Sequence, residues 1–172
     1  MRLSLLTILL FINSISFSQQ SVINLKSGQH EIEYKFDILN QNEKYYRYVL
    51  FSEIPSTEII NQLKDIGMNL LEYLPKNMYI CSIDKFILQT QLEKFNVISL
   101  NKILPSFKID KKLKNNYPDW AYKKGELSLK LILHKDANYN ESLKLIQSKY
   151  EKVQFNDKSS RIFVTIDESN LL

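Results

Sequence analysis

An internal repeat of the hydrophobic pattern is the feature that most constrains the fold of this chain. Residues 45–84 and 128–167 align without a gap, with Asp167 lying 83 positions after Asp84. Both stretches predict strand, helix, strand and strand in that order. Identities are few: Glu58 with Glu141, Ile83 with Ile166, and Asp84 with Asp167. The repeat therefore rests on side-chain pattern, and it predicts two copies of one small unit.

The first copy is the more complete one. Its expected strands are residues 45–51, 70–74, 78–83 and 97–104. Ser56 and Gly67 bound the first expected helix, and Asp84 is expected to be the N-cap of the second. With right-handed crossovers, this order predicts a ferredoxin-like antiparallel sheet over residues 45–105, with both helices on one face.

The second copy, residues 127–172, predicts only the first four of these six elements. Its expected strands are residues 127–134, 152–155 and 161–166, and its expected helix is 140–150. Only five residues follow Asp167, so a second helix and a fourth strand are missing. We therefore expect an incomplete sheet, either cut from a longer protein or completed by a partner.

The first 18 residues predict an export signal. Arg2 precedes an apolar stretch that is too short to anchor the chain in a bilayer, and small residues favour cleavage between Ser18 and Gln19. The chain is therefore expected to be secreted, into the medium or the periplasm, without a membrane anchor. Because Cys81 is the only cysteine, no internal disulfide is expected.

Two further segments flank the copies. Residues 19–44 predict a leader hairpin that turns at 27–29, and residues 106–126 predict a lysine-rich linker. Trp120 in this linker would more commonly pack back onto its own chain, but it is also a candidate anchor for a partner.

The repeat alignment assigns the two faces of the first sheet. If Leu129, Leu131 and Leu133 point at the helices, so do their counterparts in the first copy. The side chains left on the outer face are then Tyr45, Arg47, Val49, Phe51, Met78 and Ile80. Their counterparts in the second copy are the more polar Ser128, Lys130, Ile132, His134, Arg161 and Phe163. An open apolar face needs a cover, which is a partner or, alternatively, the leader hairpin or the second copy. On this assignment, Val49→Asp should leave the fold intact.

The sequence indicates neither catalysis nor a metal site. Its three glycines stand in no phosphate-loop or catalytic-serine motif. His30 and His134 are far apart and read as surface residues, and Cys81 is expected to be a small buried apolar side chain. No enzymatic activity, no cofactor and no metal are expected. The formal net charge of +4 comes mainly from dispersed lysines, so nucleic acid is not an expected partner either.

A family resemblance is carried by Tyr46-Arg47-Tyr48-Val49-Leu50-Phe51, Ile54-Pro55-Ser56, Ile66-Gly67, residues 70–79, Phe95-Asn96-Val97 and Leu104-Pro105. These segments resemble the N-terminal region of secreted bacterial subtilases, in which a signal and a propeptide-like region precede the serine protease domain. The resemblance covers residues 45–113 well and the second copy more loosely. Its motifs are structural, so it implies a fold more directly than an activity.

The resemblance implies a folding assistant and inhibitor for a subtilisin-type protease. In such precursors the open sheet face docks on the enzyme, and a C-terminal segment enters the active-site cleft. The outer-face residues of the first copy would be the docking set, and the protease domain would be missing or encoded separately. Two further hypotheses stay open: a free-standing secreted binding module, and an independent protease inhibitor that acts in trans.

Overall fold

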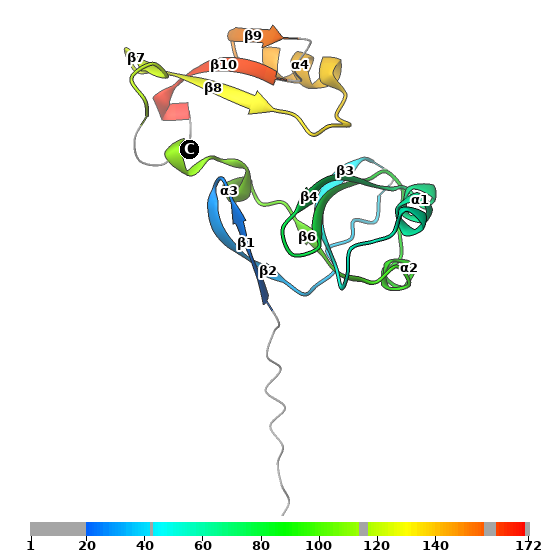
Figure 1. Ribbon diagram of the computed structural model, residues 1–172. Helices are drawn as coiled ribbons and strands as arrows, with labels where there is room; N and C mark the ends of the chain where they lie inside the picture. The colour runs from blue at the N-terminus through cyan, green and yellow to red at the C-terminus, as the bar shows by residue number, and fades with distance from the viewer. Residues whose placement is uncertain (1–19, 42, 114–116, 157–160, 171–172) are drawn as a thin grey trace, which may run out of the picture.

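The computed structural model describes residues 20–41, 43–113, 117–156 and 161–170 (Figure 1). The expected export signal and its cleavage site between Ser18 and Gln19 therefore lie outside the described residues. The described residues form two α+β units, each with a four-stranded antiparallel sheet, and one two-stranded hairpin. The expected class, α+β with antiparallel sheets, is confirmed.

The first unit is built on a sheet with the strand order β4-β5-β3-β6. Its strands are β3 (Tyr45–Phe51), β4 (Met68–Leu74), β5 (Met78–Ile83) and β6 (Val97–Lys102). Two helices, α1 (Thr57–Asp65) and α2 (Gln89–Glu93), connect them. Leu63 of α1 and Leu92 of α2 are buried in one apolar cluster, which places both helices on the same face of the sheet (Figure 1).

The ends of the helices follow local signals only in part. Ser56 caps α1, as expected, because its side chain accepts a hydrogen bond from the Ile59 N–H at 3.3 Å. Gly67 follows α1 with φ +94°, and a Cβ there would lie 2.6 Å from the Asp84 carboxylate. The expectation that Asp84 caps the second helix is wrong. Its N–H instead donates to the Gly67 carbonyl, and α2 begins five residues later with Leu88 at the N-cap.

The strand register corrects the face assignment of the first sheet. Val49 pairs with Tyr79 and lies in the cluster beneath the helices, together with Tyr45 and Phe51. Met78 and Ile80 lie on the opposite face, with Tyr46, Tyr48 and Leu50. The expected outer set, Tyr45, Arg47, Val49, Phe51, Met78 and Ile80, therefore combines residues from both faces. The error is one residue along β3, which exchanges the faces because side chains alternate along a strand.

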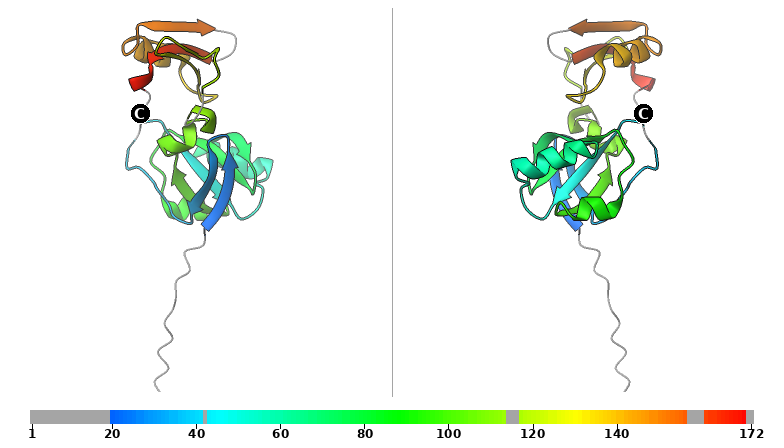
Figure 2. Two further views of the ribbon diagram at one scale, coloured as in Figure 1. Left: turned by 90° about the vertical axis from the view of Figure 1, so that its left-hand side faces the viewer. Right: turned by 90° about the vertical axis from the view of Figure 1, so that its right-hand side faces the viewer.

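The leader hairpin covers the face opposite the helices. It consists of β1 (Gln20–Leu25) and β2 (Gly28–Glu33), closed by the Leu25–Gly28 pair. A hairpin was expected here, but it turns at Lys26–Ser27 and not at 27–29, because Gly28 and Gln29 already pair with β1. Ile23 and Ile32 are each 2% exposed and pack in one cluster with Tyr48, Leu50, Met78 and Ile103. The hairpin lies across the first unit in the left view of Figure 2. The alternative cover considered above, the leader, is thus the one that the structure shows.

Arg47 ties the segment after the hairpin to the first sheet. Its guanidinium is buried, donates from Nε to the Asp37 carbonyl at 2.8 Å and pairs with the Asp37 carboxylate at 3.1 Å. The neighbouring backbone also bonds to β6, since the Asp37 N–H donates to Leu100 O at 2.7 Å. The guanidinium of Arg47 therefore forms its ion pair and hydrogen bonds within its own chain. These groups are then not free to bind a partner.

The second unit repeats the plan of the first. Its elements are β7 (Tyr122–Lys123), β8 (Glu126–Ile132), α4 (Tyr139–Gln147), β9 (Lys152–Asn156) and β10 (Arg161–Asp167). The sheet order β9-β10-β8-β7 matches β4-β5-β3-β6, with β7 at the position of β6. Asp84 follows β5 and Asp167 ends β10, so these two residues occupy equivalent places. The β7 strand precedes β8 in the chain and was not expected. It corrects the prediction that this sheet lacks a fourth strand, although β7 has only two residues and comes from the segment before the copy.

A one-residue shift separates the two copies at their first strand. Leu127 pairs with Ile166, as Tyr45 pairs with Ile83, so Leu127 is the structural counterpart of Tyr45. The alignment without a gap had matched Tyr45 with Ser128. The second copy therefore has one more residue between β8 and β10 than the first copy has between β3 and β5. An alignment without a gap misses this residue, which explains why the faces of the first sheet were exchanged.

The expected linker is largely structured. Its start overlaps α3 (Pro105–Lys108), and it contains the 3-10 turn Lys111–Leu113 and β7. Phe107 packs against the hairpin-side cluster of the first unit, whereas Leu113 and Tyr117 pack against the core of the second. The segment is therefore in contact with both units.

The corrected face assignment predicts that Val49→Asp unfolds the chain. Val49 is fully buried, and an unpaired carboxylate beneath the helices should cost more than about 4 kcal/mol. Urea unfolding followed by circular dichroism measures this, with Ile54→Asp as the control because Ile54 is exposed. A loss below about 1 kcal/mol for Val49→Asp would contradict the register described here.

Candidate functional site

The residues expected to dock on a partner are covered by the chain itself. Five of the six are almost completely buried: Tyr45, Arg47, Val49, Phe51 and Met78. Ile80 is half-buried against the hairpin cluster. A partner could reach the five buried side chains only if the helices or the hairpin moved away.

The part of the chain that the structure describes places no such cover over the equivalent outer face of the second sheet. Register places on it Ser128, Lys130, Ile132, Lys152, Gln154, Arg161, Phe163 and Thr165. Ile132 is 68% exposed and Phe163 is 43% exposed. Ser128, Lys130, Ile132, Arg161 and Phe163 were predicted on the outer face of this copy, and their placement there is confirmed. We call this surface, with Trp120, Lys123 and Lys124 beside it, the open face.

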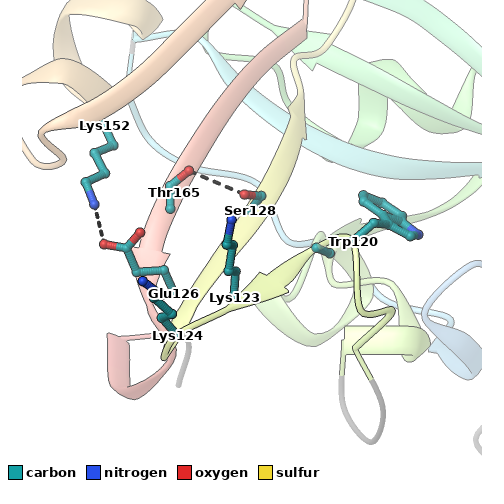
Figure 3. Close-up of a pocket in the computed structure, with 8 residues that line it drawn as sticks. Trp120, Lys123, Lys124, Glu126, Ser128, Lys152 and Thr165 are labelled. Atoms are coloured by element: carbon teal, nitrogen blue, oxygen red, sulfur yellow. Dashed lines mark hydrogen bonds and ion pairs between the residues drawn. The ribbon is translucent and has the colours of Figure 1, made fainter.

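Trp120 borders a shallow hollow of about 600 Å³ at one end of the open face (Figure 3). Its side chain is 83% exposed, so it does not pack back onto its own unit as commonly expected. The remaining lining residues are Ala121, Lys123, Lys124, Glu126, Ser128, Lys152 and Thr165. An exposed indole beside an apolar and polar floor is typical of a contact residue in a protein interface.

The open face carries a surplus of positive charge. Its cations are Lys123, Lys124, Lys130, Lys152 and Arg161. Among the described residues of this face, Glu126 is the carboxylate that forms an ion pair, with Lys152. The Ser128 and Thr165 hydroxyls lie 3.4 Å apart and provide neutral hydrogen-bonding groups between the charges. The surface therefore favours an acidic partner.

A polar contact joins the two units at the loop after β8. The His134 ring stacks on Tyr46, with centroids 4.1 Å apart and planes 21° apart. The Asp136 carboxylate accepts a hydrogen bond from the Ser82 hydroxyl at 2.6 Å and forms an ion pair with Lys44 at 3.2 Å. His134 is thus part of this contact and not an ordinary surface histidine, nor does it belong to the open face.

The contact changes the acidity of its groups. Burial alone would raise the pKa of Asp136, but the hydrogen bonds from Ser82 and Lys44 outweigh it and keep that pKa below its ordinary value. Burial, with the nearby Asp136 charge, raises the pKa of Tyr46 to about 12. Burial and the Lys108 charge lower the pKa of His134. At neutral pH the contact therefore combines a charged carboxylate with a neutral imidazole.

The contact brings a serine, a histidine and an aspartate together, but not in a catalytic order. The Ser82 hydroxyl is fully buried and donates directly to Asp136, so it is not positioned by a basic imidazole. Burial raises the pKa of Cys81 to about 12, and its thiol is fully buried, as expected for a small apolar side chain. His30 lies 2.7 Å from the Ser27 hydroxyl and packs on Phe107. Within the described ranges, no group of three or more potential ligands is arranged to hold a metal ion.

Comparisons with known proteins identify a family but no function. A family model described as a domain of unknown function (DUF8729) matches residues 12–104, which is more than half of the chain. No curated protein and no solved structure matches the chain. None of the helices in the described segments is long and apolar enough to cross a bilayer.

The inter-unit contact predicts a pH-dependent effect of Asp136→Asn. A depressed carboxyl pKa contributes stability above the ordinary value of 3.8, and that stability is lost as pH falls through the lower folded value. At pH 6 we expect the variant to melt about 2–4 °C below the wild type, a loss of about 1 kcal/mol. The difference should shrink below pH 4. Asp119→Asn, in an exposed position, is the control. A difference that is the same at pH 6 and pH 3 would show that the carboxylate charge is not involved.

Proposed function

We propose that this chain, which belongs to the family described as a domain of unknown function (DUF8729), is an exported, non-catalytic binding module of the propeptide-like kind that precedes subtilisin-type proteases. The family match ends at Leu104, so it covers the leader hairpin and the first unit together. The role proposed is that of a folding assistant or inhibitor that docks on a protease domain. No cofactor is part of this role.

The strand order supports the propeptide-like interpretation. In β4-β5-β3-β6 the first strand of the unit lies between the third and the fourth, and both helices lie on one face. We propose that this order, with both helices on one face, makes the two units variants of a ferredoxin-like sheet. Because one fold serves many functions, the order supports the family resemblance and does not identify the partner.

The contrast between the outer faces of the two sheets carries the proposal. The first face is covered by Ile23 and Ile32 of the hairpin, whereas the second exposes Trp120, Ile132 and Phe163. Exposed apolar side chains gathered beside cations are a marker of an interaction surface. We therefore assign docking to the open face of the second unit and not to the residues expected from the first.

The described chemical groups favour binding over catalysis. Ser82 is held by a carboxylate, and Cys81 is buried with a raised pKa, so neither resembles an activated nucleophile. The open face carries lysines, hydroxyls and aromatic side chains without a buried acid–base pair. These are contact groups, which is why we propose that the module itself has no enzymatic activity.

One observation favours a second candidate function, a free-standing secreted binding module whose target is not a protease. In a propeptide of the subtilase type, the face opposite the helices contacts the enzyme, but in this chain the hairpin occupies that face. A protease would therefore have to dock in another way. Both candidates use the open face, and they differ in the class of partner.

Titration of the exported chain against a subtilisin-type protease separates the two candidates. We expect slower hydrolysis of a chromogenic peptide and a complex on size-exclusion chromatography. Phe163→Ser should weaken inhibition at least tenfold, because a contact residue at the centre of an interface contributes about 2 kcal/mol or more. Ile54→Ser is the matched control, because it also replaces an exposed apolar side chain by serine, but in the first unit.

Unchanged hydrolysis with a large excess of the chain would exclude the protease as partner and leave the second candidate. Equal losses for Phe163→Ser and Ile54→Ser would show that the open face is not the docking surface. Circular dichroism and thermal melting of both variants check that the fold is retained.

A further inference from the structure

The second sheet has one strand edge that the described residues leave largely without a partner. β7 pairs with β8 at Glu126 and Leu127, and the Ser128 N–H donates to Ala121 O at 2.7 Å. Alternate residues of a strand direct their backbone groups to the same side, so Lys130 and Ile132 present theirs to the same edge as Ser128. Within the described ranges, no strand pairs with β8 at these two residues on that side.

The first unit shows which kind of segment such an edge accepts. Lys130 and Ile132 are the counterparts of Tyr48 and Leu50, which pair with Asn101 and Ser99 of β6. In that sheet β6 runs antiparallel to β3, and its Leu100 is fully buried opposite Val49. The corresponding position in the second unit is Leu131, which lies on the core face and is only partly buried. An added strand would complete this core with an apolar residue.

The charges along the edge indicate the chemistry of the added strand. Three exposed lysines lie along this edge. Lys130 is on the unpaired part of β8, Lys123 precedes it in the chain and Lys135 follows it. Among the described residues, none of these three lysines has a carboxylate at ion-pair distance. The carboxylates that form ion pairs do so with other cations, and they are Glu33, Asp37, Glu126 and Asp136. The lysines also disfavour a second copy of the same edge, because like charges would face one another across the new pair.

We propose that the edge of β8 from Lys130 to Ile132 binds an extended acidic segment of a partner protein, which adds to the sheet as an antiparallel strand. Alternate side chains of that segment are apolar, and they pack opposite Leu131 on the core side. The others include carboxylates, which lie on the open face near Lys130. The inference rests on the binding function proposed above and deepens it, because it specifies the segment that the open face recognises.

A synthetic peptide provides a direct test. The probe is a ten-residue peptide of alternating glutamate and valine, capped at both ends, and its control has lysine in place of glutamate. Isothermal titration calorimetry with the full exported chain measures the binding. We expect the glutamate peptide to bind, and we expect its affinity to fall at least fivefold when NaCl rises from 50 to 300 mM. The lysine peptide should not bind. Equal binding of the two peptides would overturn the proposal.

Two substitutions at Lys130 separate backbone pairing from charge. Lys130→Pro removes the N–H that faces the open edge and leaves the bonds between β8 and β10, so we expect at least tenfold weaker binding. Lys130→Gln keeps the N–H and should weaken binding two- to fivefold. If Lys130→Pro binds the glutamate peptide as tightly as the wild type, the edge is not the site.

Amide NMR of the wild-type chain covers the case in which Lys130→Pro does not fold. The peptide should shift the Lys130 and Ile132 amide signals and slow their hydrogen exchange, and unchanged signals would refute the edge. Peptide binding that depends on the Lys130 N–H, without protease binding, would refute the protease function and support this inference. Protease binding with unchanged Lys130 and Ile132 amide signals would support the protease function and refute this inference.

Discussion

The first sheet is apolar on both faces, and the need to cover both is the constraint on which the rest of the structure depends. The helices cover the Val49 side, and Ile23 and Ile32 of the hairpin cover the Tyr48 side. The buried pair of Arg47 with Asp37 then fixes the chain that leads from the hairpin into the sheet. The leader is therefore part of the folded body, which agrees with a family match that includes it.

Local signals in the sequence predict the elements well but the faces poorly. The two ends of α1, at Ser56 and Gly67, could be predicted because capping and a positive φ depend on only a few neighbouring atoms. In β3, residues 48–51 are all buried, so no alternation of polar and apolar residues marks an inner face. Contacts beyond β3 itself assign the faces, since the hairpin covers the Tyr48 side and the helices cover the Val49 side. β8 does alternate, with Ser128 and Lys130 between leucines, and its outer face was predicted correctly.

The candidate site could be predicted only in outline for a related reason. β7 has two residues and no hydrophobic period, so nothing in the lysine-rich segment indicated a strand. The exposure of Trp120 likewise depends on how this segment runs between the units. What becomes visible only in the structure is the comparison of the copies. The first sheet has a filled edge and a covered outer face, whereas in the second β7 fills the edge of β8 only at Glu126 and Leu127, and the described residues leave the outer face open. That difference is the reason we propose the second copy as the docking unit.

Residue-resolved hydrogen exchange of the chain without a partner tests this difference most directly. The amides of Lys130 and Ile132 should exchange at least a hundredfold faster than those of Tyr48 and Leu50, their counterparts beside β6. Among the described residues, only Tyr48 and Leu50 have a strand paired with them at this edge. Comparable protection at the two pairs of sites would mean that the edge of β8 is already occupied, and it would contradict the account of a closed first unit and an open second one.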